Sequence, residues 1–347
     1  MKKICLIIFI ISCNLVNAQY KIQNLPTKEE DRFPLVSTSD KVIEENINLY
    51  LHSKFLEKVY QSTKNPLEGI IKDDGNRRAY FHEYEVNKNT IPVLSLSILS
   101  EYCGAYCEES YEYSNFDLNN GSIITINDLI DHNKAETLTK ILNNKIRKEI
   151  NDFILNIPKN NQIDKEDIQF YTDQREIYNE CLNNINLYKI NDNGFDFYLS
   201  NDSIYLQRGR CSNHAMRALD ELGNFTIGFS KTEIAPYLSE YGKNLYRNLP
   251  RKMTDIKEKI FTGTIGKYPI KGIITNYNSG YYWYERTKKL IDIDFTNEDG
   301  KIIIKENNKD YNNIATFILK QKDHQLIGTW SKINSNESLP VEINFNL

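Results

Sequence analysis

The sequence predicts an α+β fold in which an antiparallel sheet with packed helices is followed by a C-terminal all-β barrel or sandwich of about eight strands. Three observations support this. Apolar residues recur at helical spacing in segments 43–59 and 138–146, alternating apolar and polar residues mark strands around them, and only short alternating segments follow residue 258. Because strands and helices do not alternate regularly, the pattern indicates α+β rather than a parallel α/β sheet.

The chain begins "MKKICLIIFIISCNLVNAQ", in which two lysines precede a short apolar run and small residues follow. This pattern predicts a signal peptide over residues 1–18, cleaved after Ala18. An alternative is a lipoprotein signal, with the lipid on Cys13 of "IISC". No later segment is apolar for about 18 residues, so we expect no transmembrane span and a location in the periplasm or outside the cell.

Charge and length limit the classes of partner. Residues 1–18 carry two lysines and no acids, so the chain from residue 19 has 41 basic and 47 acidic residues and a net charge of −6. Both signs are interspersed, whereas a nucleic-acid-binding protein needs a clustered basic face. A moderate negative charge permits attraction to a basic partner. About 329 residues exceed one typical core, so we expect two or three units.

The first unit should span residues 39–245, after an extended leader over 19–38 that is polar and contains two prolines. Apolar residues at every fourth position from Ile43 to Phe55 predict an amphipathic helix, which Ser39 or Asp40 can cap.

Strands and further helices follow within this unit. "PVLSLSILSEY" and "SYEYSNFDL" alternate as strands, "NNG" forms a turn, and the segment beginning "NDLIDHNKAETL" changes to helical spacing. The stretch 156–190 is polar and poorly periodic. "DFYLSNDSIYLQ" predicts a hairpin, "FTIGFS" a strand, and "KTEIAPYLSEYG" a short helix ended by glycine.

A charged connector over 246–257 precedes the β domain, which we place at 258–347. Its eight short alternating segments have tight turns at "NEDG" and "KDH". Regularly spaced short strands are typical of a small antiparallel barrel or sandwich.

Four cysteines remain after cleavage, namely Cys103, Cys107, Cys181 and Cys211. An even number in an oxidising compartment favours disulfides, and of the three connectivities we prefer Cys103–Cys107 with Cys181–Cys211. A zinc site that includes His214 of "CSNH" is the alternative, but the spacing matches zinc motifs only loosely. We therefore predict no metal and no cofactor.

Motifs for catalysis are absent from the chain after residue 18: there is no "GxSxG", "HExxH", "GxxxxGK[ST]" or "GxGxxG". His214, beside Cys211, is the best single candidate for chemistry. Neighbouring carboxylates such as Glu108 and Glu109 could serve as an acid and base pair. A hydrolase acting on envelope glycans is therefore the alternative function.

Tyrosine is unusually common, with 23 in the chain. Aromatic residues cluster at 102–116 and again at 281–284. In the second cluster, Tyr281 and Trp283 must face opposite to Tyr282 and Tyr284 along one strand. Exposed tyrosines suit protein or sugar recognition, and cross-strand packing within the sheet is the alternative. The predicted ligand-binding residues are Tyr102, Tyr106, Tyr111, Tyr113, Tyr282 and Tyr284.

The stretch "LSLSILSEYCGAYCEESYEYSNFDLNNGSIITINDLI" resembles a bacterial family of extracytoplasmic domains of unknown function, found in the ectodomain of a lysozyme-sensing anti-sigma factor and beside peptidoglycan deacetylase domains. "FTIGFSKTEIAPYLSEYG" is similar to the closing strand and helix of that family, so the resemblance covers about residues 40–245. The matching positions are Tyr102, Gly104, Ala105, Asn115, Phe116, Asp117, Gly121, Asp128 and Leu129.

Two positions depart from the family pattern, because Cys103 replaces a glycine and Tyr106 replaces a histidine. Any role of that histidine is therefore not transferred. We also expect no deacetylase-like catalytic domain and no transmembrane anchor in the chain after residue 18, so deacetylation and transmembrane signalling are not transferred. The resemblance and the tyrosines together favour a secreted or periplasmic non-catalytic binding protein, whose partner is an envelope protein or a cell-wall glycan.

Overall fold

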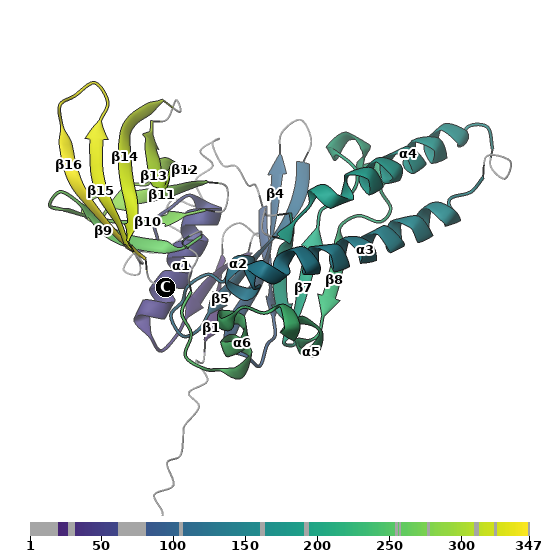
Figure 1. The fold of residues 1–347 in the computed structure, drawn as a ribbon, viewed down its shortest axis with the longest axis horizontal. Coiled ribbons are helices and arrows are strands. Elements are labelled where there is room, and N and C mark those ends of the chain that lie inside the picture. The colour runs from purple at the N-terminus through teal and green to yellow at the C-terminus, as the bar shows by residue number, and fades with distance from the viewer. Residues whose placement is uncertain are drawn as a thin grey trace, which may run out of the picture.

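The computed structural model describes residues 20–26, 32–61, 81–103, 107–159, 164–190, 194–253, 256, 258–275, 278–308, 312–322 and 325–345. The predicted signal peptide and Cys13 lie outside these residues. Figure 1 shows a β-barrel at one end of the molecule, two long helices at the other, and small antiparallel sheets between them. Among the described residues, no helix is both long and apolar enough to cross a membrane.

A hairpin lies in the segment where an extended leader was expected. Strands β1 (Lys21–Pro26) and β2 (Arg32–Ser37) pair antiparallel. Phe33 and Val36 are fully buried in the same core as helix α1 (Lys41–Leu56). The prediction of an extended leader is corrected, because the two strands pair with each other and bury Leu25, Phe33 and Val36 in that core. Asp40 caps α1, as its sequence position indicated, by accepting hydrogen bonds from Val42 and Ile43.

A first three-stranded sheet packs on α1. Its strands are β3 (Phe81–Asn87), β4 (Val93–Cys103) and β5 (Cys107–Asp117), in the order β3-β4-β5. The predicted period of two in β4 is present, because Leu94, Leu96 and Ile98 are all fully buried in the core shared with α1.

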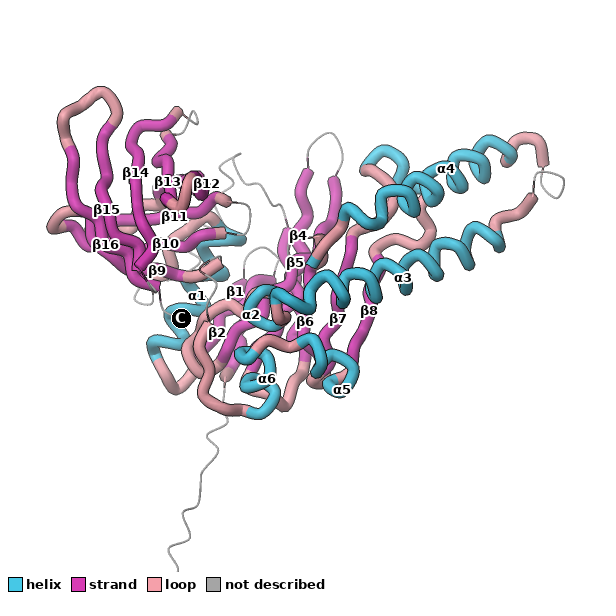
Figure 2. Tube along the Cα trace, in the orientation of Figure 1, coloured by secondary structure: helices cyan, strands magenta, loops and turns pink. Residues whose placement is uncertain are grey.

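A second three-stranded sheet, β6-β7-β8, is covered by helices. Its strands are β6 (Asp196–Ser200), β7 (Ser203–Arg208) and β8 (Phe225–Phe229). Figure 2 shows the long helix α3 along this sheet, and the contacts agree, since α3 and all three strands share one apolar core. The helical elements here are α2 (Ile126–Leu129), α3 (His132–Asn156), α4 (Ile168–Asn184), η2 (Ile185–Leu187), η4 (His214–Leu219), α5 (Lys231–Ile234), η5 (Ala235–Tyr237) and α6 (Glu240–Arg247).

Two helical predictions need correction. The poorly periodic stretch 156–190 contains α4, which buries only four side chains and therefore has a weak apolar period. Gly242 does not end a helix but lies inside α6. A Cβ at Gly242 would lie 2.6 Å from the carbonyl oxygen of Leu129, so this glycine permits the close approach of α6 to the end of α2.

The C-terminal strands close into a barrel, which decides between the barrel and sandwich predictions. The eight strands pair consecutively, and β16 pairs back with β9. They are β9 (Ile260–Ile265), β10 (Tyr268–Ile274), β11 (Ser279–Tyr284), β12 (Ile291–Glu298), β13 (Lys301–Asn307), β14 (Asn313–Lys322), β15 (Gln325–Lys332) and β16 (Ser338–Phe345). Closure leaves no strand edge unpaired.

The aromatic cluster of β11 is divided between two cores. Tyr282 is 1% exposed inside the barrel, where its hydroxyl donates to Glu306 at 2.9 Å, and half-buried Tyr284 packs against the same core. Trp283, on the opposite face, is buried against α1. Tyr282 is therefore not available to an external ligand, because its side chain is buried inside the barrel. The binding role of half-buried Tyr284 stays a prediction.

Buried ion pairs join the barrel to the first part of the chain. Lys259, just before β9, donates to Asp128 and to the Ile123 carbonyl, each at 2.6 Å, and neither charged side chain is exposed. Arg251 donates through Nε to Asp117 at 2.6 Å, and both side chains are 1% exposed. Because a charge that is buried without its partner destabilises the folded state, these pairs hold in place the segment that leads into the barrel.

We expect Lys259→Met to lower the free energy of unfolding by about 3–5 kcal/mol, because the Asp128 carboxylate would remain buried without its counter-ion. Chemical denaturation would measure the change. The matched control is Lys148→Met, which removes an exposed ion pair with Asp152 and should leave stability nearly unchanged. Adding Asp128→Asn to Lys259→Met should restore part of the loss, and equal effects of the two lysine substitutions would contradict the assignment.

Stability should also fall in mild acid because of His52. This side chain is 2% exposed between the rings of Phe33 and Tyr60, and burial lowers its pKa from 6.5 to about 4. Between pH 6.5 and 4 the unfolded chain binds more protons than the folded chain, so the free energy of unfolding decreases by about 3 kcal/mol as the pH falls.

Denaturation at a series of pH values would test this expectation. His52→Phe should remove this part of the pH dependence, and His132→Gln, which changes an exposed histidine, should retain it. An unchanged pH profile in His52→Phe would show that other groups are responsible.

Candidate ligand-binding groove

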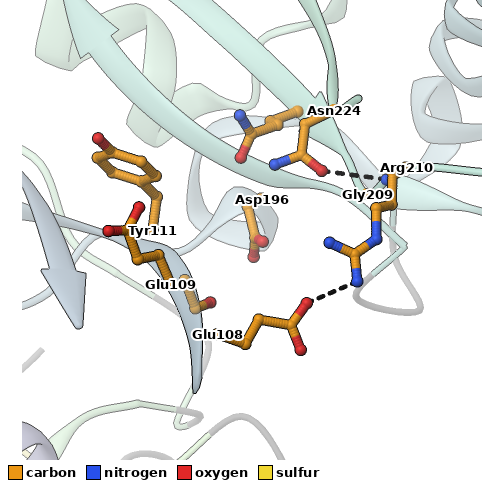
Figure 3. A pocket seen from close by; sticks show the side chains of 9 residues that line it. Glu108, Glu109, Tyr111, Asp196, Gly209, Arg210 and Asn224 are labelled. Carbon is orange, nitrogen blue, oxygen red and sulfur yellow. Dashed lines mark hydrogen bonds and ion pairs between the residues drawn. The ribbon is translucent and has the colours of Figure 1, made fainter. Parts of the chain in front are cut away.

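A polar cavity of about 450 Å³ lies between β5 and the ends of β6 and β7. Figure 3 shows the side chains that line the cavity; they come from β5, β6 and β7 and from the loops at positions 209–210 and 224. They are Glu108, Glu109, Ser110, Tyr111, Asp196, Gln207, Gly209, Arg210 and Asn224. Nearly all can form hydrogen bonds, so the cavity suits a polar ligand.

A stack of three tyrosine rings lies beside the cavity. Tyr113 and Tyr198 have ring centroids 4.9 Å apart with an interplanar angle of 28°, and Tyr198 and Tyr205 are 4.8 Å apart at 4°. Tyr198 and Tyr205 lie directly opposite in the β6–β7 register, so the strand spacing sets the ring spacing. The stack ends at Gly228 on β8, where a Cβ would lie 2.9 Å from the Tyr205 ring.

The stack and the cavity belong to one surface, which we call the groove. Residues two apart on a strand share a face. Tyr111 and Tyr113 are two apart on β5. On β6 the cavity residue Asp196 is two positions from Tyr198, and on β7 the cavity residue Gln207 is two positions from Tyr205. The groove thus consists of the cavity residues together with Tyr113, Tyr198 and Tyr205.

One carboxylate of the groove, that of Glu108, is paired with basic side chains. Glu108 accepts a hydrogen bond from Arg210 at 2.6 Å and lies 2.7 Å from Nδ1 of His214. The hydrogen bond from Arg210, assisted by the charges of Arg210 and His214, lowers the pKa of Glu108. The structure thus brings together two residues that the sequence suggested separately for catalysis, Glu108 and His214.

Two other carboxylates in the cavity have no such partner. Among the described residues, neither Glu109 nor Asp196 has a hydrogen-bond or ion-pair partner. Removal from water raises the pKa of Asp196; the charge of Lys54 opposes this shift, and the carboxylates Glu112 and Glu258 add to it. Burial likewise raises the pKa of Tyr113 to about 12, so its hydroxyl stays protonated and can donate a hydrogen bond. The groove therefore carries both acceptors and donors.

The segment 209–224 forms one wall of the groove and is anchored at several points. Asp220 accepts from the backbone N–H of Ser212 at 2.7 Å and from the Tyr178 hydroxyl at 2.8 Å. Arg210 is held through its backbone N–H, which donates to Asn224 at 3.1 Å. A disulfide between Cys181 and Cys211 ties the segment to α4.

The cysteine predictions have separate outcomes. The Cys181–Cys211 disulfide is confirmed, and these two sulfurs are therefore not zinc ligands. Cys107 is also disulfide-bonded, and its Cα lies opposite that of Cys103 across β4 and β5. The Cys103 side chain lies outside the described residues, so the Cys103–Cys107 pairing stays a prediction.

Several residues of the family-like motif have structural roles. The Asn115 side chain donates to the Phe197 carbonyl at 3.0 Å and accepts from Leu199 N–H at 3.3 Å, which joins the two sheets beneath the groove. Gly121 has φ of +73°, and a Cβ there would lie 2.7 Å from a backbone oxygen of α1. With Asp117 and Asp128 in buried ion pairs, these residues of the motif build the framework of the fold.

Of the predicted binding residues, Tyr111 and Tyr113 lie in the groove. Tyr106 and the side chain of Tyr102 lie outside the part of the chain that the structure describes. Sequence reasoning missed Tyr198, Tyr205 and Arg210. The hairpin "DFYLSNDSIYLQ" contained a signal for the tyrosines, because a two-residue turn at Asn201–Asp202 places Tyr198 opposite Tyr205.

Comparison with known proteins gives one structural neighbour of note. No family model and no curated protein matches the sequence. A crystal structure of a DUF3298 family member from Bacteroides fragilis aligns with a TM-score of 0.34 and 12% identity, covering 65% of this chain and 94% of that chain. The neighbour belongs to a bacterial family of domains of unknown function. A likeness at this level identifies no ligand.

We expect Asp220→Ala to loosen the groove wall without unfolding the protein. The substitution removes the acceptor for Ser212 N–H, Gly223 N–H and the Tyr178 hydroxyl, and such a loss costs about 1–3 kcal/mol of local stability. Hydrogen exchange should become faster at 212–223 and stay unchanged in the barrel. Asp152→Ala, on the exposed face of α3, is the control, and equal exchange in both variants would remove Asp220 from this role.

Proposed function

We propose that this protein is an extracytoplasmic binding protein that holds a cell-wall glycan in the groove and has no catalytic activity of its own. The observation that carries the proposal is the position of the tyrosine stack beside a cavity rich in carboxylate, amide and guanidinium groups. Sugars present both apolar C–H faces and many hydroxyl groups, so they need aromatic area and hydrogen-bonding groups together.

The individual residues fit this ligand class. Tyr111 lines the cavity and is 47% exposed, so it offers aromatic surface to a sugar ring. Asp196 and Glu109 can accept hydrogen bonds from sugar hydroxyls, and Gln207 and Asn224 can both donate and accept. Glu108 has Arg210 as its partner, so it orients the guanidinium at the cavity edge.

Location at the cell envelope is supported by the N-terminal sequence and by the resemblance of residues 40–245 to domains found in a lysozyme-sensing anti-sigma factor and beside peptidoglycan deacetylases. An envelope protein is the other partner considered. A small polar cavity favours a glycan over a flat protein surface, because protein interfaces bury larger areas.

Glycan hydrolysis is a second candidate, favoured by one observation. Glu109 and Asp196 line the same cavity, and the raised pKa of Asp196 suits a general acid. The same binding assay separates the two functions, because a hydrolase would convert the glycan to shorter products. Product formation that is lost in Asp196→Asn would replace the binding proposal.

Binding can be tested by calorimetry with the chain from Gln19 and soluble peptidoglycan fragments of defined length. We expect Tyr111→Ala and Tyr198→Ala each to weaken affinity about tenfold, the order of one aromatic contact. The matched control is Tyr268→Ala, which removes a similarly exposed tyrosine (46%) from the barrel and should leave affinity unchanged. Equal affinities of all three variants, or no binding by the unmodified chain, would contradict the proposal.

A further inference from the structure

Arg208, the last residue of β7, is a buried cation without an anionic partner. Its side chain is 3% exposed, and its Nε and Nη1 atoms have no hydrogen-bond partner in the described structure. No carboxylate among the described residues forms an ion pair with it. Burial of an uncompensated charge is unfavourable, and here burial lowers the pKa of Arg208.

Among the described residues, the guanidinium contacts Tyr188 and the disulfide, and the interaction with Tyr188 partly opposes the effect of burial on the Arg208 pKa. The guanidinium carbon lies 3.8 Å from the centroid of the Tyr188 ring. Nη2 lies 3.5 Å from Sγ of Cys181, which is bonded to Cys211. A disulfide sulfur is a weak, neutral acceptor, whereas a thiolate at the same position would be the missing anion.

From this geometry we infer that Cys181–Cys211 is a site of reversible reduction, in which Arg208 stabilises the thiolate of Cys181. An adjacent arginine favours the thiolate form of cysteine, and a sulfur that leaves as a stabilised thiolate leaves faster. A reductant can reach Cys211 more easily than Cys181, because Cys211 is partly exposed and Cys181 is only 6% exposed. Cys211 is therefore the sulfur that is attacked and Cys181 the one that leaves.

The co-reactant is a dithiol reductant. Its thiolate attacks Sγ of Cys211, the Cys181–Cys211 bond breaks, and Cys181 leaves with the electron pair as a thiolate beside Arg208. The second thiol of the reductant then displaces Cys211 and closes the reductant's own disulfide. Two electrons pass to the protein, one of the two dithiol protons goes to Cys211, and the other is released to solvent.

Reduction would act on the groove through segment 209–224. Cys211 lies in this segment, which supplies Gly209, Arg210 and Asn224 to the cavity. Breaking the disulfide removes the covalent attachment of that wall to α4 and leaves its hydrogen bonds. The redox inference stands independently of which ligand the groove binds.

The first test is the equilibrium of the chain from Gln19 with dithiothreitol redox buffers, followed by alkylation and peptide mass spectrometry so that Cys181 and Cys211 are resolved from Cys103 and Cys107. We expect Arg208→Met to lower the equilibrium constant for reduction at least tenfold, which corresponds to about 30 mV. Arg208→Lys should lower it less. Arg217→Met, which removes an exposed cation from the same segment, should have no effect, and an Arg208→Met value equal to that of Arg217→Met would overturn the inference.

A second measurement keeps Arg208 in place, in case the methionine variant does not fold. In Cys211→Ser, the thiolate absorbance of Cys181 should titrate well below pH 8.5, the usual pKa of cysteine. Burial in an apolar core alone would raise that pKa, so a midpoint at or above 8.5 would overturn the inference. Hydrogen exchange at 209–224 should also be faster in the reduced protein than in the oxidised protein. Equal exchange would show that reduction does not loosen the groove wall.

Discussion

The arrangement of this protein depends on the buried ion pair between Lys259 and Asp128. Asp128 also accepts from the N–H and hydroxyl of Thr125 at 2.8 Å, so the same carboxylate that caps α2 binds the lysine at the start of the barrel. One acidic group thereby fixes both a helix start and the entry of the chain into β9. A buried pair of this kind contributes specificity more than net stability, because the desolvation of both charges offsets their attraction.

The same junction explains the division of the aromatic cluster in β11. Once Lys259 is held, the outer face of β11 packs on α1, and Lys271 of β10 reaches Glu45 of α1 at 3.0 Å. Trp283 is therefore covered by α1, and Tyr282 fills the barrel. The aromatic residues of β11 face the barrel interior and α1, whereas the tyrosines of the groove lie on the small sheets between the barrel and the two long helices.

Different contacts hold the two sides of the groove. Asn115 bridges β5 to β6 through its side-chain amide and so places the Tyr113 ring against Tyr198, whereas Asp220 and the Cys181–Cys211 disulfide hold the opposite wall. On β5 a buried residue and an exposed residue are close in sequence, since Asn115 is 1% exposed and Tyr111 is 47% exposed.

The sequence by itself determined the elements whose burial follows a simple period: α1, α3, β4 and the eight C-terminal strands. It limited the cap of α1 to Ser39 or Asp40 and left three disulfide connectivities open, and the tertiary structure decided for Asp40 and for Cys181–Cys211. The sequence could not determine α4, which buries one narrow stripe, or the β1–β2 hairpin, whose few apolar residues are buried only because α1 lies over them. Tyr111 and Tyr113 could be selected from composition. The meeting of Glu108 with Arg210 and His214, and of Arg208 with Cys181, depended on the tertiary structure, because these contacts join residues that are 27 to 106 positions apart and no local pattern encodes which distant side chains converge.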